Sequence, residues 1–337
     1  MIYFLSLLVC FSFAQNSALP GRPPIPKNNP QTKKKIELGK MLYFDPRLSV
    51  DGTVSCNSCH NVMNGGSDNR SFSSGVNGHR GGRSAGTVFN SAFYSVQFWD
   101  GRARSLEEQA KGPLTNPIEM GNPNHDVVIA RVKKIPGYVT QFKKVFGKKN
   151  PVNIDNLAKA IASYERTLIT PNSPFDKFIK GKKKFLSVEA RNGYQTFQSV
   201  GCVTCHSGPN FAGPMLPEGT GFFMKFPTFP NTDYDKKYNF TKDTGRFEVT
   251  KKEQDKYFFR VPTLRNIALT APYFHNGSVM TLAEAVRVMG KTQLNKDLSE
   301  MEVKNLVAFL NSLTGVIPPQ SMPTLPATKN TTLVDPK

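Results

Sequence analysis

Four cysteines and two histidines recur in the same short pattern at two places in the sequence. The pattern is Cys-x-x-Cys-His, formed first by Cys56, Cys59 and His60 and again by Cys202, Cys205 and His206. In this order two thiols can add across the two vinyl groups of one haem, and the adjacent histidine is placed to ligate the iron from one side. The two copies use every cysteine except Cys10. The spacing therefore predicts two covalently attached haem c groups.

Other uses of paired cysteines fit this spacing less well. A zinc site built from both pairs would need about 140 residues between its halves, against ~15–20 in compact zinc motifs, and would leave the two histidines unexplained. A thioredoxin-like redox pair needs a βαβ context, which is absent. Two disulfides could form in an exported protein, although a two-residue gap closes only a very small loop.

An apolar run at the start of the sequence predicts export. Residues 1–14 are too few to span a bilayer as a helix but have the length of a signal-peptide core, and Ser12 and Ala14 supply the small residues of a cleavage site. We expect a signal peptide over 1–14, loss of Cys10, and a periplasmic protein that is not integral to the membrane. The alternatives are a retained N-terminal anchor, because no basic residue precedes the run, and lipidation at Cys10, which the bulky Val9 disfavours.

The length of the chain predicts two folded domains or three, and the composition indicates many loops. The 337 residues include 38% hydrophobic and 11% aromatic side chains, which excludes global disorder. The 25 prolines and 26 glycines indicate long connections, and no long alternating strand pattern occurs. We therefore expect a mainly α fold.

Helical periodicity recurs before each cysteine motif. Residues 31–44 and 187–200 predict helices that lead into the first and the second motif, and residues 126–134 and 154–168 predict two more. Capping boxes at residues 281–284 and 299–302 open two further helices. Long loops are expected over 64–86 and 209–257. The order of helix, motif, loop and closing helix thus occurs twice.

This repeat predicts two haem domains. They are an N-terminal cytochrome c domain over residues 15–170 and a C-terminal one over 187–315, joined by a Pro- and Lys-rich linker over 171–186. Residues 316–337 form a Pro-rich tail that either packs back on the N-terminal domain or is disordered.

The second axial position of each iron decides what the haem does. With His60 and His206 used, the candidates are His79, His125 and His275 together with the methionines. A methionine would raise the reduction potential and block substrate, whereas an open position admits peroxide. Two haems of unlike ligation would let one store an electron while the other does chemistry. We expect His125 only to cap or precede its helix.

Six further segments carry a specific resemblance. They are Phe98 to Ala103 (FWDGRA), Gln109 to Pro113 (QAKGP), Glu119-Met120, Val261 to Asn266 (VPTLRN), Tyr273 to Gly277 (YFHNG) and Met289-Gly290. In combination they resemble the bacterial di-haem cytochrome c peroxidase family over residues 35–313. The resemblance implies two cytochrome-c-like helical domains, with the active haem in the N-terminal one, and reduction of hydrogen peroxide to water.

The resemblance also implies roles for single residues. His60 becomes the proximal ligand of a low-potential peroxidatic haem, and His206 and Met289 become the two ligands of a high-potential haem that relays electrons. By periodicity alone Met289 is a core residue of its helix. Trp99, the only tryptophan, would lie between the haems as an electron route, with a buried core residue as the simpler interpretation. His275 would bond a haem propionate.

Gln109 and Glu119 match the family's residues on the peroxide side of the catalytic haem. Cleavage of peroxide needs a base that takes a proton from one oxygen and returns it to the other. Glu119 can do this, whereas the Gln109 amide can only orient the substrate through hydrogen bonds. Without the resemblance, Glu119 would be interpreted as a solvated loop carboxylate.

The sequence departs from the family at two places. Many relatives block the resting catalytic iron with a distal histidine, but here Val76 takes that position, so we expect an open iron unless His79 binds instead. The family also carries an interdomain calcium ion. Thr270 and Pro272 match its backbone carbonyl donors, but Ser84 replaces an asparagine, so calcium would bind more weakly.

The charge predicts an acidic partner. Lys and Arg total 44 against 25 Asp and Glu, a net charge of +19, with lysine clusters at 33–35, 143–144, 148–149, 182–184 and 251–252. Such a surface would steer an acidic donor, and we expect a small soluble monohaem cytochrome c; nucleic acid is disfavoured because no binding motif is present. A homodimer is compatible with the resemblance.

Two other functions stay open. One is a di-haem electron carrier without catalysis, with both irons six-coordinate. The other is a MauG-like oxidase of a partner protein, a group that carries tyrosine where this chain has Met289.

Overall fold

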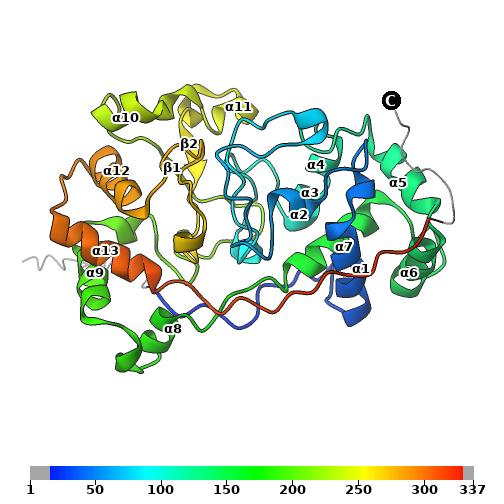
Figure 1. Ribbon diagram of the computed structural model, residues 1–337, viewed down its shortest axis with the longest axis horizontal. Coiled ribbons are helices and arrows are strands. Elements are labelled where there is room, and N and C mark those ends of the chain that lie inside the picture. Colours follow the sequence, from blue (N-terminus) through cyan, green and yellow to red (C-terminus); the bar gives the residue numbers. More distant parts are fainter. Residues whose placement is uncertain (1–15, 329–337) are drawn as a thin grey trace, which may run out of the picture.

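The computed structural model describes residues 16–328, which are mostly helical with one two-stranded sheet (Figure 1). The mainly α expectation is confirmed; the predicted signal peptide and residues 329–337 of the tail lie outside the described part. No helix between residues 16 and 328 is long and apolar enough to cross a membrane. The helices are α1 Lys33–Phe44, α2 Cys56–Cys59, α3 Leu106–Gln109, α4 Gly112–Thr115, α5 His125–Lys133, α6 Pro136–Phe146, α7 Ile154–Glu165, α8 Pro174–Ile179, α9 Val188–Ser199, α10 Asp233–Tyr238, α11 Phe247–Thr250, α12 Leu282–Leu294 and α13 Glu300–Asn311.

Helices α1 and α7 form a closely packed pair in the N-terminal half. Thr32 caps α1 and Asn153 caps α7, each by accepting a backbone N–H with its side-chain oxygen. The apolar faces of both helices belong to one buried cluster. At Gly39 a Cβ atom would lie 1.8 Å from the carbonyl oxygen of Ala160, so only glycine permits this approach. The pair supports the chain that enters the first motif at α2.

Helices α9 and α13 repeat this arrangement in the C-terminal half. Ser187 caps α9, and Ser299 and Glu302 form a reciprocal capping box on α13, which confirms that prediction. At Gly193 a Cβ atom would lie 1.9 Å from the carbonyl oxygen of Asn305. Helix α9 then delivers the chain to the second motif, as α1 does to the first.

The short strands tie the loops of the two halves together. β1 (Phe223–Lys225) and β2 (Phe258–Arg260) pair antiparallel, with Met224 opposite Phe259. At the end of β2 the Arg260 N–H donates to the carbonyl oxygen of Trp99 at 2.7 Å. The sheet therefore holds the Trp99 loop against the C-terminal half.

Several elements differ from the predictions. Helix α6 was not expected, α8 lies inside the predicted linker, and β1, α10 and α11 lie where a long loop was predicted. The capping box at residues 281–284 is only half formed. Thr281 accepts the Glu284 N–H, but the Glu284 carboxylate accepts from Tyr238 and Lys237 instead of returning to Thr281.

The two ends of the described chain cross the molecule in opposite directions. The side-chain amide of Asn16 donates to the carbonyl oxygen of His206 at 3.0 Å, so the first described residues lie on the C-terminal half. The Arg47 guanidinium donates to the carbonyl oxygen of Pro326 at 2.8 Å, so the tail lies on the N-terminal half. In Figure 1 the dark blue and red segments run past each other along the lower edge.

Candidate haem sites

The first motif opens on a cavity of about 740 Å³. Cys56 and Cys59 bound the short helix α2, His60 follows it, and all three line the cavity. Nδ1 of His60 lies 2.9 Å from the carbonyl oxygen of Gly86. Because a carbonyl only accepts, Nδ1 carries the proton and Nε2 keeps its lone pair for a metal. Burial lowers the pKa of His60, which favours the neutral, ligating imidazole.

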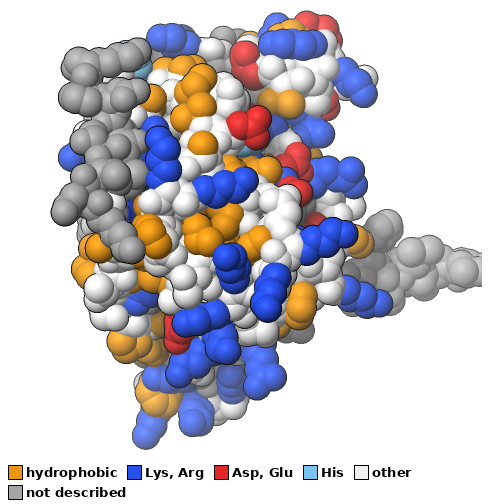
Figure 2. All heavy atoms as spheres, turned by 90° about the vertical axis from the view of Figure 1, so that its right-hand side faces the viewer, with side chains coloured by type: hydrophobic (Ala, Val, Ile, Leu, Met, Phe, Trp, Pro, Cys, Tyr) orange, Lys and Arg blue, Asp and Glu red, His pale blue; other side chains and the backbone are white. Residues whose placement is uncertain are grey.

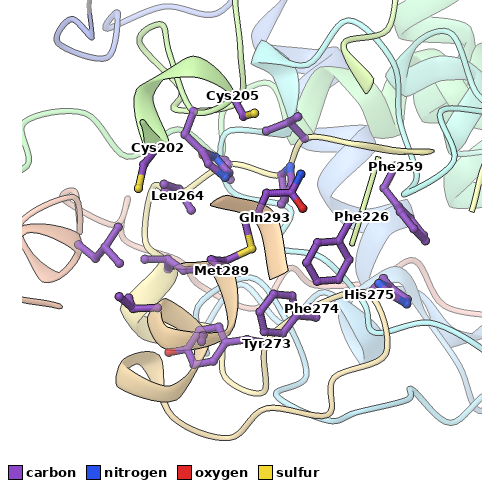
Figure 3. Close-up of a pocket in the computed structure, with 18 of the residues that line it drawn as sticks. Cys202, Cys205, Phe226, Phe259, Leu264, Tyr273, Phe274, His275, Met289 and Gln293 are labelled. Atoms are coloured by element: carbon purple, nitrogen blue, oxygen red, sulfur yellow. The ribbon is translucent and has the colours of Figure 1, made fainter. Parts of the chain in front are cut away.

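The second motif opens on a cavity of about 250 Å³ with the same histidine geometry. Nδ1 of His206 lies 3.0 Å from the carbonyl oxygen of Phe211, and burial lowers the pKa of this imidazole. Met289 reaches the cavity from α12, and Figure 3 shows its sulfur directed inward, below Cys202 and Cys205. The two motifs thus each offer a pair of thiols and an available imidazole nitrogen, which is the donor set that haem c requires.

The alternative uses of the cysteines are contradicted by the structure. In the structure no disulfide joins the cysteines of either motif. The pairs line different cavities, and across residues 16–328 no group of three or more His, Cys, Asp or Glu side chains could hold a metal ion. A joint zinc site is therefore wrong.

A shared wall separates the two cavities. The residues that line both are Ser84, Ala85, Gly86, Thr87, Tyr94, Trp99 and Arg260. The Trp99 indole N–H donates to the carbonyl oxygen of Ser84 at 2.9 Å. Trp99 is thus fixed at a position that touches both candidate haem sites, and it is not part of a buried hydrophobic cluster of the described residues.

Gln109 and Glu119 line the first cavity and not the second. Gln109 is the last residue of α3. Glu119 lies in a loop held against Gly75, where a Cβ atom would come within 2.6 Å of the Glu119 carbonyl oxygen. Burial raises the pKa of Glu119, although Arg102 and a hydrogen bond from Asn116 act in the opposite direction. The structure therefore brings together the two side chains expected beside the peroxide.

Val76 and His79 occupy different surroundings. The Val76 side chain is buried, and its N–H donates to the carbonyl oxygen of Glu119 at 2.9 Å. His79 is exposed and lines neither cavity. In this conformation no histidine of the loop reaches the first cavity opposite His60.

His275 is buried against the wall of the second cavity. Its side chain is 2% exposed and stacks on Phe259 with ring centroids 4.5 Å apart. Both residues are labelled in Figure 3. Burial lowers the pKa of His275 to about 4, although Asp243 favours the charged form. Nε2 has no hydrogen-bond partner among the described residues. A buried nitrogen of this kind leaves room for a polar group of a bound cofactor.

The three residues expected around calcium belong to the lining of one cavity. Ser84, Thr270 and Pro272 all line the second cavity. A neighbouring residue that the sequence did not point to, Asn69, donates its amide to the carbonyl oxygens of Leu269 and Ala271, both at 2.9 Å. The loop that carries the candidate donors is thereby held in place.

Glu165 is a further cavity residue that the sequence reasoning missed. It is 6% exposed, lines the first cavity, and its Oε2 has no hydrogen-bond partner among the described residues. A signal was present, because Glu165 follows Leu157 and Ile161 at intervals of four residues and so lies on the apolar face of α7.

Comparisons with known proteins agree with this arrangement. The family described as di-haem cytochrome c peroxidase matches residues 33–184. The chain is 45% identical to the cytochrome c551 peroxidase of Pseudomonas aeruginosa, over 97% of this chain and 96% of that protein, and 45% identical to the cytochrome c551 peroxidase of Nitrosomonas europaea, over 92% and 88%. A solved MauG-like protein associated with microbial copper homeostasis superposes with a TM-score of 0.78 at 28% identity, covering 90% of this chain and 96% of that one.

A mostly helical chain with two separate Cys-x-x-Cys-His sites, each facing its own cavity, defines a di-haem c-type cytochrome. The near full-length similarity then narrows the class: this chain belongs to the di-haem cytochrome c peroxidase family, whose enzymes are oxidoreductases that act on peroxide.

Proposed function

We propose that this protein reduces hydrogen peroxide to water in the periplasm, with electrons from a small c-type cytochrome. The His60 site is the peroxidatic one, and the His206 and Met289 site relays electrons to it. The observation that carries this assignment is an asymmetry: Gln109 and Glu119 face only the first cavity, while the Met289 sulfur enters only the second.

The proposed roles follow from what each side chain can donate or accept. Haem c would be held by the two cysteines and the histidine of each motif, and it would supply the electrons and the position at which peroxide binds. Glu119 takes the proton from one peroxide oxygen and returns it to the other, and its raised pKa makes the carboxylate a stronger base for the first of these transfers. The Gln109 amide orients the substrate. Trp99 lies in the shared wall and provides the electron route between the sites.

The same proposal includes the domain division. We propose two cytochrome-c-like units over residues 15–170 and 187–315, each built on one helix pair and one motif, with residues 171–186 as the linker. A calcium ion near Ser84, Thr270 and Pro272 would be held by carbonyl and hydroxyl oxygens and water, which suits a hard cation.

A substitution of Glu119 tests the peroxidase function. In the half-reduced holoprotein, Glu119→Gln should slow the peroxide-dependent change of the haem spectrum by about 10²- to 10⁴-fold in stopped-flow experiments, because the general base is lost. Glu37→Gln, an exposed glutamate on α1, should leave the rate unchanged. If the parent protein shows no spectral response to peroxide at all, the electron-carrier alternative is favoured.

A further inference from the structure

Arg260 is the charged residue among those that line both cavities, and the proposed function gives its charge no role. It is the last residue of β2, directly after Phe259, and lines both cavities. Its Nε donates to the carbonyl oxygen of Phe98 at 3.0 Å, and its backbone N–H donates to that of Trp99 at 2.7 Å. The guanidinium carbon lies 3.6 Å from the centroid of the Tyr94 ring. These contacts fix the guanidinium in the wall.

The charge of Arg260 is not neutralised within the described residues. No carboxylate there forms an ion pair with it, whereas Arg83 and Arg102, which also line the first cavity, both pair with Asp100. In the described part of the chain, Arg260 is also the only Lys or Arg that lines the second cavity, and no Asp or Glu lines it. A half-buried guanidinium without a counter-ion is costly. An anion is therefore expected at this wall.

The donors of Arg260 and the proposed cofactor together indicate that this anion is a carboxylate. Nε and Nη1 of Arg260 donate to the carbonyl oxygens of Phe98 and Val261, whereas Nη2 has no hydrogen-bond partner among the described residues. The two N–H donors of Nη2 are therefore free for carboxylates, which guanidinium groups bind well. The proposed cofactor carries two propionate carboxylates, away from the vinyl groups that the cysteines hold. We propose that Arg260 is a shared carboxylate-binding residue for the propionates of both haems. This inference rests on the proposed function only in assuming that both haems are attached.

A single cation between two haems has a measurable consequence. A positive charge favours the reduced, less positive state of each iron, and the effect reaches both because the charge lies in their common wall. Arg260 is a positioning residue in this proposal: it holds the cofactor carboxylates and the Trp99 backbone, and it takes no part in cleaving peroxide.

Redox titration without peroxide tests the proposal independently of peroxidase activity. In Arg260→Gln the ratio of reduced to oxidised haem at a fixed potential should fall about tenfold at both haems, which is 59 mV for a one-electron couple. Arg246→Gln is the matched control. It removes the same charge, but Arg246 lines neither cavity, and its guanidinium lies over Phe223 and donates to the Asp100 carbonyl oxygen. It should change both ratios less than threefold.

Arg260→Lys gives a second measurement. It keeps the charge but replaces the two-pronged donor by a single ammonium group, so both ratios should fall by roughly two- to fourfold, between parent and Gln variant. Pyridine haemochrome assays check that each variant retains two haems, and if the Gln variant does not, the Lys variant carries the test. Unchanged ratios in the tested variant overturn the proposal. A shift at one haem alone overturns the sharing.

Discussion

Glu119 and Glu165 face the same cavity but differ in what surrounds their carboxyl groups. Arg102 and Asn116 favour the charged form of Glu119, so burial raises its pKa against opposition. For Glu165 burial dominates and raises the pKa to about 8, with Arg166 acting in the opposite direction. Glu119 is therefore suited to exchange a proton, whereas Glu165 stays protonated at neutral pH.

Glu165 should make the stability of the protein depend on pH. Its folded pKa of about 8 lies above the ordinary value of about 4.3 in the unfolded chain. The stabilisation from holding the neutral acid is thus complete below about pH 4.3 and is lost as the pH rises through about 8. Glu165→Gln removes this linkage, so its stability relative to the parent should rise by roughly 4–5 kcal/mol from pH 4 to pH 9, measured by chemical denaturation. Equal pH profiles for parent and variant would contradict this, and Glu37→Gln should match the parent at both pH values.

At the residue scale, the sequence predicts functional residues that lie close together in the chain and misses those that only the fold brings together. The cysteines and histidines of each motif lie within five consecutive positions, so the spacing alone reveals them. Arg260 reaches the wall through a bond to Phe98, which is 162 residues away in sequence. No local pattern marks such a residue, because its surroundings exist only after the strands and loops have met.

The two helix pairs are the repeated elements of this fold. In each, a glycine on the helix before the motif lies against a backbone carbonyl of the closing helix: Gly39 against Ala160, and Gly193 against Asn305. The close approach lets the backbones pack without an intervening side chain. Each pair therefore gives its motif a rigid base.

Replacing either glycine should destabilise the half in which it lies. Gly39→Ala and Gly193→Ala would each force a methyl group against a carbonyl oxygen and cost about 3 kcal/mol. Gly21→Ala is the control, since a Cβ atom there meets nothing within 4 Å; it should change stability by less than about 0.5 kcal/mol. Denaturant unfolding followed by far-ultraviolet circular dichroism measures both effects. A cost below about 1 kcal/mol for Gly39→Ala and Gly193→Ala would show that the two helices of each pair can move apart easily.

At the element scale, helices with clear apolar periodicity were predicted to within a few residues, and α6 was not. Its first two residues, Pro136 and Gly137, have the composition of a turn, yet proline is favourable in the first turn of a helix because its missing N–H needs no partner there. The buried Tyr138 and Phe142 then give α6 its apolar side. The strands β1 and β2 were missed because three residues are too few to show an alternating pattern.

Across the whole molecule, a buried ion pair secures the N-terminal segment. Arg265 and Asp176 are completely buried and lie 2.7 Å apart, and the Asp176 carboxylate also accepts the Leu19 N–H. The Arg265 guanidinium donates to the carbonyl oxygen of Ser17. The segment, α8 and the loop after β2 therefore share one charged junction.

Breaking this junction should be costly. Asp176→Asn removes the carboxylate and leaves the buried Arg265 charge uncompensated, so we expect a loss of about 3 kcal/mol in the free energy of unfolding. Asp233→Asn, at an exposed pair with Lys236, should cost less than about 0.5 kcal/mol. Thermal or denaturant unfolding of the holoprotein measures the loss of stability in each variant. Similar losses for Asp176→Asn and Asp233→Asn would contradict a larger contribution from the buried pair.

One end of the molecule carries a group of exposed lysines. Figure 2 shows many Lys and Arg side chains and few acidic ones on the face that carries α5 and α6. The exposed lysines there are Lys133, Lys134, Lys143, Lys144, Lys148 and Lys149. If an acidic cytochrome is steered by this charge, kcat/KM for the donor should fall roughly fivefold or more between about 10 mM and 500 mM salt. Turnover that does not respond to salt would remove the steering argument.

The crossed ends of the chain have a consequence for synthesis. Asn16 binds the carbonyl oxygen of a histidine 190 positions further on, so on a growing polypeptide it waits for most of the remaining chain to emerge. The tail, in turn, closes over a half that was made first. The last steps of folding are thus deferred until nearly the whole chain is available, and the N-terminal half cannot reach its final form alone.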